Sequence, residues 1–276
     1  ERKEEKRIGI IHGGYCLILK NLLLIGYGIV GKAVYNGLGE KNYIDVHDPD
    51  AGWDNEKPYS DFDGIILCLP TPQGPRGECD DMLVEQYITN IRIEEPEMPI
   101  LIKSTISIEL VELLEDDKFL TYNPEFLTEA DSIDEFQEQR FAIFGGHQSK
   151  FWYEIFIQSI YIDEVRFTTM KNAAFAKYAI NSFLATKVIF FNELKAVYNK
   201  SVTRITDSEF DSLTELISLD ERIGDSHMMV PGTDMQYGFG GKCLPKDTLA
   251  FATSASRAGS PLKLLEEAIM INNKLR

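Results

Sequence analysis

The sequence predicts an α/β protein, with a Rossmann-type, doubly wound parallel sheet followed by a mostly helical domain. Two observations predict the sheet: short apolar segments alternate with helical ones up to about residue 168, and a glycine turn follows the first apolar segment. The helical part is predicted by the stretch 171–200, which lacks Pro and Gly and has apolar residues at helical spacing. We therefore expect domains at 20–168 and 169–276, after an N-terminal extension of uncertain role at 1–19.

The first domain is expected to contain six strands, each short, apolar and typical of buried parallel strands. They are predicted at 22–25, 43–47, 64–69, 100–103, 119–122 and 141–144. Ligands of such sheets bind beyond the carboxyl ends of the strands, so the residues after each strand are candidates for function. In the second domain, helices are expected at 171–200, 208–219, 246–258 and 261–276, with a loop at 238–241.

The chain is acidic, with 28 Lys plus Arg against 44 Asp plus Glu and a formal charge of -16. Such a charge repels nucleic acids and anionic membrane surfaces, so neither is an expected partner. The apolar run at 15–25 is interrupted by Lys20 and Asn21 and is too short to cross a membrane. The four cysteines are scattered, without a CxxC pair or a His at ligand spacing, which predicts no metal site and a reduced, cytoplasmic setting.

The turn after the first strand fits the GxGxxG pattern of dinucleotide-binding folds, in which glycines let a pyrophosphate approach a helix N-terminus. Its residues are Gly26, Tyr27, Gly28, Ile29, Val30 and Gly31. This pattern alone is a weak signal, because a glycine-rich turn without a ligand looks the same. Asp48 ends the next strand at about the spacing of 20 residues expected for a ribose-binding carboxylate, and a carboxylate there favours NAD over NADP. Asp45 is the alternative, since only the strand register decides; we prefer Asp48 because it is terminal.

A second candidate site surrounds Cys243, which stands between a glycine-rich loop and a helix expected to begin at Pro245. A thiol at a helix N-terminus, with Lys242 and Lys246 nearby, has reason to ionise more easily. The alternative is a small buried cysteine without function. Three glycines in the preceding loop favour the close approach of a ligand.

The segment 238–247 resembles the GFGGxCxPKD signature of the UDP-glucose/GDP-mannose 6-dehydrogenase family. Other segments resemble motifs of the same family, in the same order along the chain. They are PTP at 70–72, KST at 103–105, NPEFLxE at 123–129, KxxxN at 177–181, NE at 192–193 and an arginine loop at 220–224. Each motif is weak by itself, and their ordered recurrence carries the resemblance.

This resemblance implies an NAD-dependent oxidation of a nucleotide sugar, such as UDP-glucose to UDP-glucuronate, by two hydride transfers through a covalent intermediate on Cys243. Lys177 and Asn181, one helical turn apart, would stabilise an oxyanion. Glu125 would act as the base that hydrolyses a thioester, while Thr105 and Asp247 would orient the water. The acidic pair Glu125 and Glu129 has a plainer alternative, an acidic helix start after a proline.

The resemblance also implies binding residues. Cofactor contacts are implied for the glycine turn and Asp48, and further for Thr71, Glu129 and Lys246. Substrate contacts are implied for Glu125, Phe126, Leu127, Lys177, Asn181, Arg222, Phe239 and Gly240. For Thr71 and Thr105, which follow strands, plain capping is the alternative.

Two departures from the family pattern affect the expected function. The stretch between Asp48 and the next strand is short, so we expect a more open adenosine pocket. The chain stops within what resembles the linking helix, at 264–276, before the nucleotide-binding domain that follows in the family. It is therefore expected to be a fragment, a natural short form, or a chain to which another chain supplies that domain. The long apolar helix from Lys171 also suggests a homodimer, as in the family, although a helix buried inside one chain would explain the same pattern. Two other functions stay open: a single-step β-hydroxyacid dehydrogenase, and an NAD-binding or subunit-interaction protein without catalysis.

Overall fold

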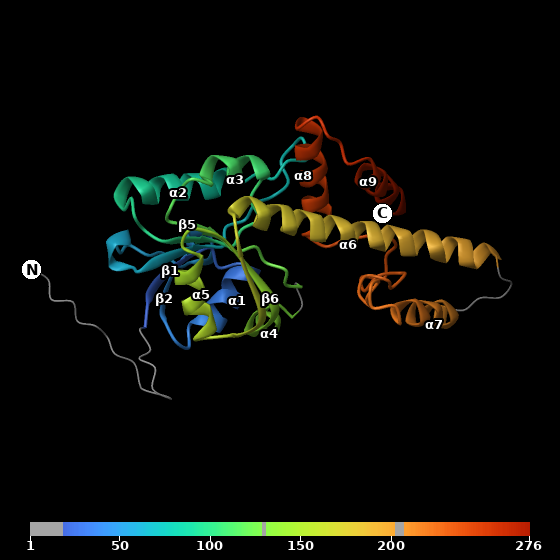
Figure 1. Cartoon of the computed structure of the whole chain (residues 1–276), viewed down its shortest axis with the longest axis horizontal. Helices are drawn as coiled ribbons and strands as arrows, with labels where there is room; N and C mark the ends of the chain where they lie inside the picture. Colours follow the sequence, from blue (N-terminus) through green and yellow to red (C-terminus); the bar gives the residue numbers. More distant parts are fainter. Residues whose placement is uncertain (1–18, 129–130, 202–206) are drawn as a thin grey trace, which may run out of the picture. The chain divides into compact units, whose positions relative to one another are not determined.

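The computed structural model describes residues 19–128, 131–201 and 207–276 (Figure 1). The chain forms two compact units. The first contains the chain up to Pro72 and from Asp80 to Lys177, and the second contains Gln73–Cys79 and Tyr178–Arg276. The expected boundary at 168 coincides with the end of the last strand, whereas the units divide about two turns into the following helix. The reason is that Met170, Ala173 and Ala174 pack into the core of the first unit.

The first unit is built around one seven-stranded sheet in the order β2-β1-β3-β4-β5-β6-β7. Its strands are β1 (Asn21–Ile25), β2 (Tyr43–His47), β3 (Gly64–Leu67), β4 (Ile100–Ile102), β5 (Leu120–Tyr122), β6 (Glu138–Gly146) and β7 (Tyr161–Thr168). The first five strands are parallel, which confirms the predicted doubly wound sheet for this part. β1 pairs with both β2 and β3, so the strand order reverses beside β1, where such sheets bind ligands.

The far edge of the sheet differs from the prediction. β6 runs antiparallel to β5, and β7, which the sequence pattern did not predict, pairs parallel with β6. Most side chains of β7 are exposed or half-buried, so this edge strand lacks the apolar run that marks a buried strand. The direction of β6 was also missed because hydrophobic patterning identifies a strand but not its orientation.

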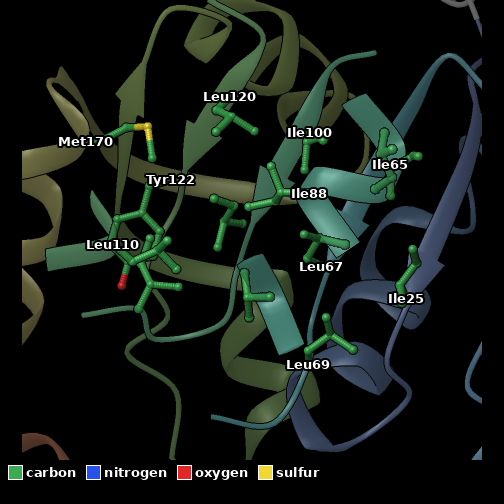
Figure 2. Packing of buried hydrophobic residues seen from close by; sticks show 14 of the residues in the cluster. Ile25, Ile65, Leu67, Leu69, Ile88, Ile100, Leu110, Leu120, Tyr122 and Met170 are labelled. Carbon is green, nitrogen blue, oxygen red and sulfur yellow. The ribbon is translucent and has the colours of Figure 1, made fainter. Parts of the chain in front are cut away.

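Helices cover both faces of the sheet because alternate strand residues point to opposite sides. On one face, Leu22 and Leu24 pack against α1 (Ile29–Leu38), α4 (Ser132–Gln137) and α5 (Ser149–Ile157). On the other face, the core shown in Figure 2 joins Ile25 and Ile65 to α2 (Met82–Glu94) and α3 (Ile108–Leu114).

The second unit is helical, as predicted. It contains α6 (Met170–Ser201) from Tyr178 onward, α7 (Asp207–Ser218), α8 (Leu244–Arg257) and α9 (Lys263–Leu275). One small core joins α6 to α9 through Ile189 and Ala268, and another joins α6 to α7 through Phe191 and Phe210. Across the described ranges, no helix is both long and apolar enough to span a bilayer.

Candidate functional site

The glycine turn between β1 and α1 has the shape that a dinucleotide needs. Gly26 has φ +95°, and a Cβ there would collide with the carbonyl oxygen of Cys68. A Cβ at Gly31 would collide with the carbonyl oxygen of Gly26, so helix and turn approach only through these glycines. A Cβ at Gly28, in contrast, would have no heavy atom within 4 Å. Gly26 and Gly31 therefore allow the turn, β3 and α1 to pack closely, and Gly28 leaves room beside the start of α1.

The strand register separates the two candidate carboxylates. Asp48 follows the last residue of β2, and its Oδ2 accepts a hydrogen bond of 2.6 Å from the backbone N–H of Tyr27 in the glycine turn. Asp45 lies within β2 opposite Leu23, and it pairs with Lys57 at 2.5 Å. Asp48 thus lies at the carboxyl edge of the sheet, beside the glycine turn. Asp45 lies in the middle of β2, away from that edge.

The surroundings of Asp48 are strongly negative. The pKa of Tyr87 is raised first by burial and then by the charges of Asp48, Asp50 and Asp54. The stretch between β2 and β3 contains only short 3-10 turns, at Pro49–Ala51 and Tyr59–Asp61, and no α-helix. Carboxylates therefore lie close to the end of β2, in a segment that forms no α-helix of its own.

Glu125 stands in a buried polar cluster of the first unit. Its Oε2 lies 2.7 Å from Nζ of Lys103, which also donates a 2.6 Å hydrogen bond to Oδ1 of Asn123. The backbone carbonyl of Glu125 accepts a hydrogen bond from Nζ of Lys177, which lies 5.1 Å from the ring centre of Phe126. Two lysines thus hold Glu125, one at its carboxylate and one at its backbone.

Lys103 also belongs to this cluster, although the resemblance to the family implied no role for it. It comes directly after β4, and its side chain is 1% exposed. A lysine is almost never fully buried unless it is paired. A lysine at the carboxyl end of an entirely apolar strand is therefore a signal in the sequence that could have identified it.

The other predicted residues of the first unit are at strand ends or in cores. Thr71 is buried beyond β3, and Thr105 is half-buried beyond β4. Leu127 is half-buried against the core that contains α1, α4 and α5. Glu129 lies outside the described residues.

In the second unit, Cys243 is exposed at the N-cap of α8. One turn into this helix, Asp247 is 1% exposed, and its Oδ2 accepts a 2.6 Å hydrogen bond from Nδ2 of Asn181 on α6. Its other oxygen, Oδ1, lies 2.7 Å from Nζ of Lys246. A thiol open to solvent is thus followed by a carboxylate that is held on both sides.

The two residues of the KxxxN motif are brought to different partners. Lys177 and Asn181 are both 6% exposed on consecutive turns of α6. Lys177 belongs to the first unit, where it meets Glu125, and Asn181 belongs to the second, where it meets Asp247. Each side chain therefore belongs to a buried polar cluster within its own unit.

The remaining predicted substrate residues lie in loops of the second unit. Phe239 and Gly240 precede Cys243; Phe239 is buried and Gly240 is half-buried. Arg222 is 88% exposed and forms hydrogen bonds of 2.9 and 2.6 Å with Asp220. These bonds from Arg222 lower the pKa of Asp220. Among the described residues, no group of three or more His, Cys, Asp or Glu could hold a metal ion.

Residues 171–274 match the UDP-glucose/GDP-mannose dehydrogenase family, central domain. The UDP-glucose 6-dehydrogenase TuaD of Bacillus subtilis is 28% identical over 227 residues, which cover 78% of this chain and 47% of that protein. The chain spans about half the length of the curated relatives that it matches.

Two solved structures show the same fold. A UDP-glucose dehydrogenase from Pyrobaculum islandicum has a TM-score of 0.77 at 20% identity, over 96% of this chain and 70% of that one. A 3-hydroxyisobutyrate dehydrogenase from Mycobacterium tuberculosis has a TM-score of 0.68 at 17% identity, over 93% of both chains. At these identities the likeness concerns architecture, a Rossmann-type sheet followed by helices.

The glycine turn gives a stability test. Replacing Gly31 with Ala should lower the free energy of unfolding by about 1–3 kcal/mol, because the added Cβ collides with a carbonyl oxygen. Replacing Gly28 with Ala, where the Cβ meets nothing, should change it by less than about 1 kcal/mol, the usual cost at an N-cap. Urea unfolding followed by circular dichroism measures both, and equal losses would contradict the geometry.

The two thiols near the sites should differ sharply in reactivity. Burial, more than the opposing charge of Lys103, raises the pKa of Cys68 to about 12, so at pH 8 this thiol stays protonated. Only a thiolate is a good nucleophile. We expect iodoacetamide at pH 8 to modify the exposed Cys243 and to spare Cys68 until the protein is unfolded, as read by peptide mass spectrometry. Faster labelling of Cys68 in the folded protein would refute this.

Proposed function

We propose that this chain, which belongs to the UDP-glucose/GDP-mannose dehydrogenase family, carries the cofactor-binding and thiol-bearing parts of an NAD-dependent nucleotide-sugar dehydrogenase. One observation carries the proposal: an exposed Cys243 begins a helix whose buried Asp247 is bonded to Asn181 of the long helix. A cysteine kept only for packing would be covered. UDP-glucose, oxidised to UDP-glucuronate, is the substrate we propose.

NAD suits the edge of the sheet where β1 and β3 end. Gly28 leaves open space, and α1 begins there without an acidic residue in its first turn, so its N–H groups can receive a pyrophosphate. Asp48 would accept hydrogen bonds from a ribose. The nearby Asp50 and Asp54 would repel a 2′-phosphate, which supports NAD rather than NADP. Thr71, Lys246 and Glu129 are proposed as further cofactor contacts from their motifs.

Two NAD molecules would be needed in turn, each to accept one hydride in one of the two oxidations. In our proposal, Sγ of Cys243, as thiolate, adds to the carbonyl carbon of the aldehyde that the first oxidation produces, giving a thiohemiacetal. Loss of the second hydride from that carbon leaves a thioester. Water then attacks the thioester, which releases the carboxylate and returns the thiol, so that alcohol and water become acid with the loss of four electrons.

The contacts support a role for each neighbouring side chain. Asn181 has one N–H bonded to Asp247, which orients the amide and leaves its second N–H for an oxyanion. Glu125 is proposed as the base for the hydrolysis, with Lys177 as a second oxyanion donor. Thr105 and Asp247 are proposed to orient the water.

The other proposed substrate contacts are Phe126, Leu127, Arg222, Phe239 and Gly240. Because half of the length of the relatives lies outside this chain, we also propose that a further nucleotide-binding domain acts with it. Neither Cys68 nor Cys243 forms a disulfide, which supports the reducing, cytoplasmic setting that we propose.

We further propose a homodimer through α6. Phe183, Phe190 and Val197 repeat every seven residues along this helix and are 69%, 58% and 60% exposed. An apolar stripe with this period is typical of helix association.

The catalytic proposal is tested with NAD and UDP-glucose, by following NADH absorbance and the mass of Cys243 peptides. We expect NADH formation and a covalent adduct on Cys243, and a loss of turnover on the order of 100-fold or more in Cys243→Ser, because serine is the weaker nucleophile. A second arm of the experiment adds, as a separate polypeptide, the part of a relative that this chain does not match.

Different outcomes separate the alternatives. Full activity of Cys243→Ser on a β-hydroxyacid would indicate the single-step dehydrogenase instead. NAD binding by calorimetry without turnover of any nucleotide sugar, even with the added domain, would indicate a binding protein and refute the enzyme.

The dimer is tested by light scattering of purified protein. Phe183→Glu combined with Phe190→Glu should convert a dimer to a monomer, because four carboxylates would then be buried at the interface. The control is Leu264→Glu on α9, which is equally exposed and lies outside the stripe, and which should leave the mass unchanged. A dimer that survives the double substitution would rule out this surface.

A further inference from the structure

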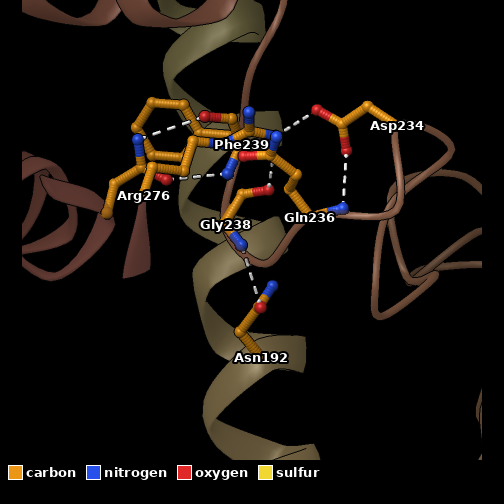
Figure 3. A network of polar contacts seen from close by, with 7 residues as sticks. Asn192, Asp234, Gln236, Gly238, Phe239 and Arg276 are labelled. Atoms are coloured by element: carbon orange, nitrogen blue, oxygen red, sulfur yellow. Dashed lines mark hydrogen bonds and ion pairs between the residues drawn. The ribbon is translucent and has the colours of Figure 1, made fainter. Parts of the chain in front are cut away.

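Two buried asparagines hold the backbone just before the Cys243 loop. Oδ1 of Asn192 on α6 accepts a 3.0 Å hydrogen bond from the N–H of Gly238. Asn272 on α9 makes two bonds to the next residue: Oδ1 accepts from the N–H of Phe239 at 2.7 Å, and Nδ2 donates to its carbonyl at 3.1 Å. Figure 3 shows Asn192 directed at Gly238 from below, within this network.

The pairing at Phe239 resembles that of a neighbouring β-strand, because one primary amide supplies both a donor and an acceptor. Asn192 and Asn272 are 5% and 6% exposed, and Phe239 is 3% exposed, so water does not compete for these groups. Leaving a buried N–H or carbonyl unpaired costs about 1–3 kcal/mol. These bonds therefore fix where the segment lies.

The orientation of Asn192 is also fixed. Its Nδ2 donates a 2.8 Å hydrogen bond to the carbonyl of Val188, one turn earlier on α6, so its Oδ1 must face Gly238. An aspartate at this position would place a second acceptor against that carbonyl. The arrangement requires an amide.

The glycines of the loop are explained by the same contacts. Gly238 has φ +74°, and a Cβ there would collide with Oδ1 of Asn272. A Cβ at Gly240 would lie 2.5 Å from the guanidinium of Arg276, which pairs with Asp234 at 2.5 Å. In contrast, Gly241 has φ +78° and open space around it. The loop is thus held by hydrogen bonds at its Gly238 end, which we call the clamp, and has free space around Gly241 next to Cys243.

We propose that Asn192 and Asn272 are positioning residues for Cys243: they anchor one end of the glycine loop so that the thiol is presented in a single position. This inference rests on the proposed function for its effect on turnover. Both side chains bond to the backbone of Gly238 and Phe239, which precede Cys243 in the loop. A flexible glycine loop needs such an anchor because glycine loses more conformational entropy than any other residue when it is ordered.

The test compares Asn272→Ala with Asn273→Ala, its exposed neighbour on the same helix, and with Asn192→Ala. We expect kcat with NAD and UDP-glucose to fall about tenfold or more in Asn272→Ala and Asn192→Ala, and to stay unchanged in Asn273→Ala. The KM for NAD should stay within about twofold in all three, because the glycine turn is untouched. A merely structural role would alter kcat and KM together with stability, so urea unfolding is measured in parallel. Asn272→Ala with the turnover of the unsubstituted protein would overturn the proposal.

Hydrogen exchange gives a second measurement that needs no activity. In the unsubstituted protein the amides of Gly238 and Phe239 should exchange at least tenfold more slowly than that of Gly241, and Asn272→Ala should remove the protection of Phe239 but leave the core strands protected. If the unsubstituted protein lacks this protection, the clamp is refuted, and this outcome does not depend on whether any variant folds. A protein that shows the protection but oxidises no nucleotide sugar refutes the proposed function and leaves the clamp supported.

Discussion

The structure depends on helix α6, because four of its buried polar side chains form hydrogen bonds with distant segments of the chain. They are Lys177, Asn181, Asn192 and Lys195. Their partners are the carbonyl of Glu125, the carboxylate of Asp247, the N–H of Gly238 and the carbonyl of Val230. With 3.6 residues per turn, the four positions fall within about 60° of one another on the helix surface. One face of α6 therefore holds the backbone at Glu125 in the first unit and, in the second unit, helix α8 and the loop segments at Gly238 and Val230.

The opposite face of the same helix is apolar and exposed. Phe183, Phe190 and Val197 lie roughly on the other side from the buried polar row. The two faces meet different needs, since buried polar groups need specific partners, whereas exposed aromatic rings gain from any apolar cover. A single continuous helix can thus order neighbouring segments through one face and expose an apolar stripe on the other, and a substitution on one face need not disturb the other.

Charge is arranged locally rather than over the whole surface. The chain is strongly acidic, yet Lys103 and Lys177 are buried beside Glu125, and Lys246 lies against Asp247. Most of the cations near the predicted residues are thus already paired. A nucleotide would have to rely on backbone N–H groups at the start of α1 and on few free cations, which makes the position of each loop more important than net charge.

The sequence by itself determined the elements that repeat or that carry a motif. Apolar periodicity located five parallel strands and the helices of the second unit. The glycine turn was recognisable from its spacing, and the cysteine loop from its resemblance to a family signature. Such features are local, because each depends on residues a few positions apart. The edge strand β7 escaped for the same reason, since it buries too little apolar surface to leave a pattern.

Tertiary structure alone decided which side chains meet. The strand register placed Asp48, not Asp45, beside the glycine turn, and folding brought Lys103 to Glu125 and Asn272 to Phe239. These partners are far apart in the chain, and no local pattern records them. The physical reason is burial: a lysine or an asparagine looks ordinary in a sequence, and it becomes a fixed part of a site only when the fold removes water and leaves it one partner.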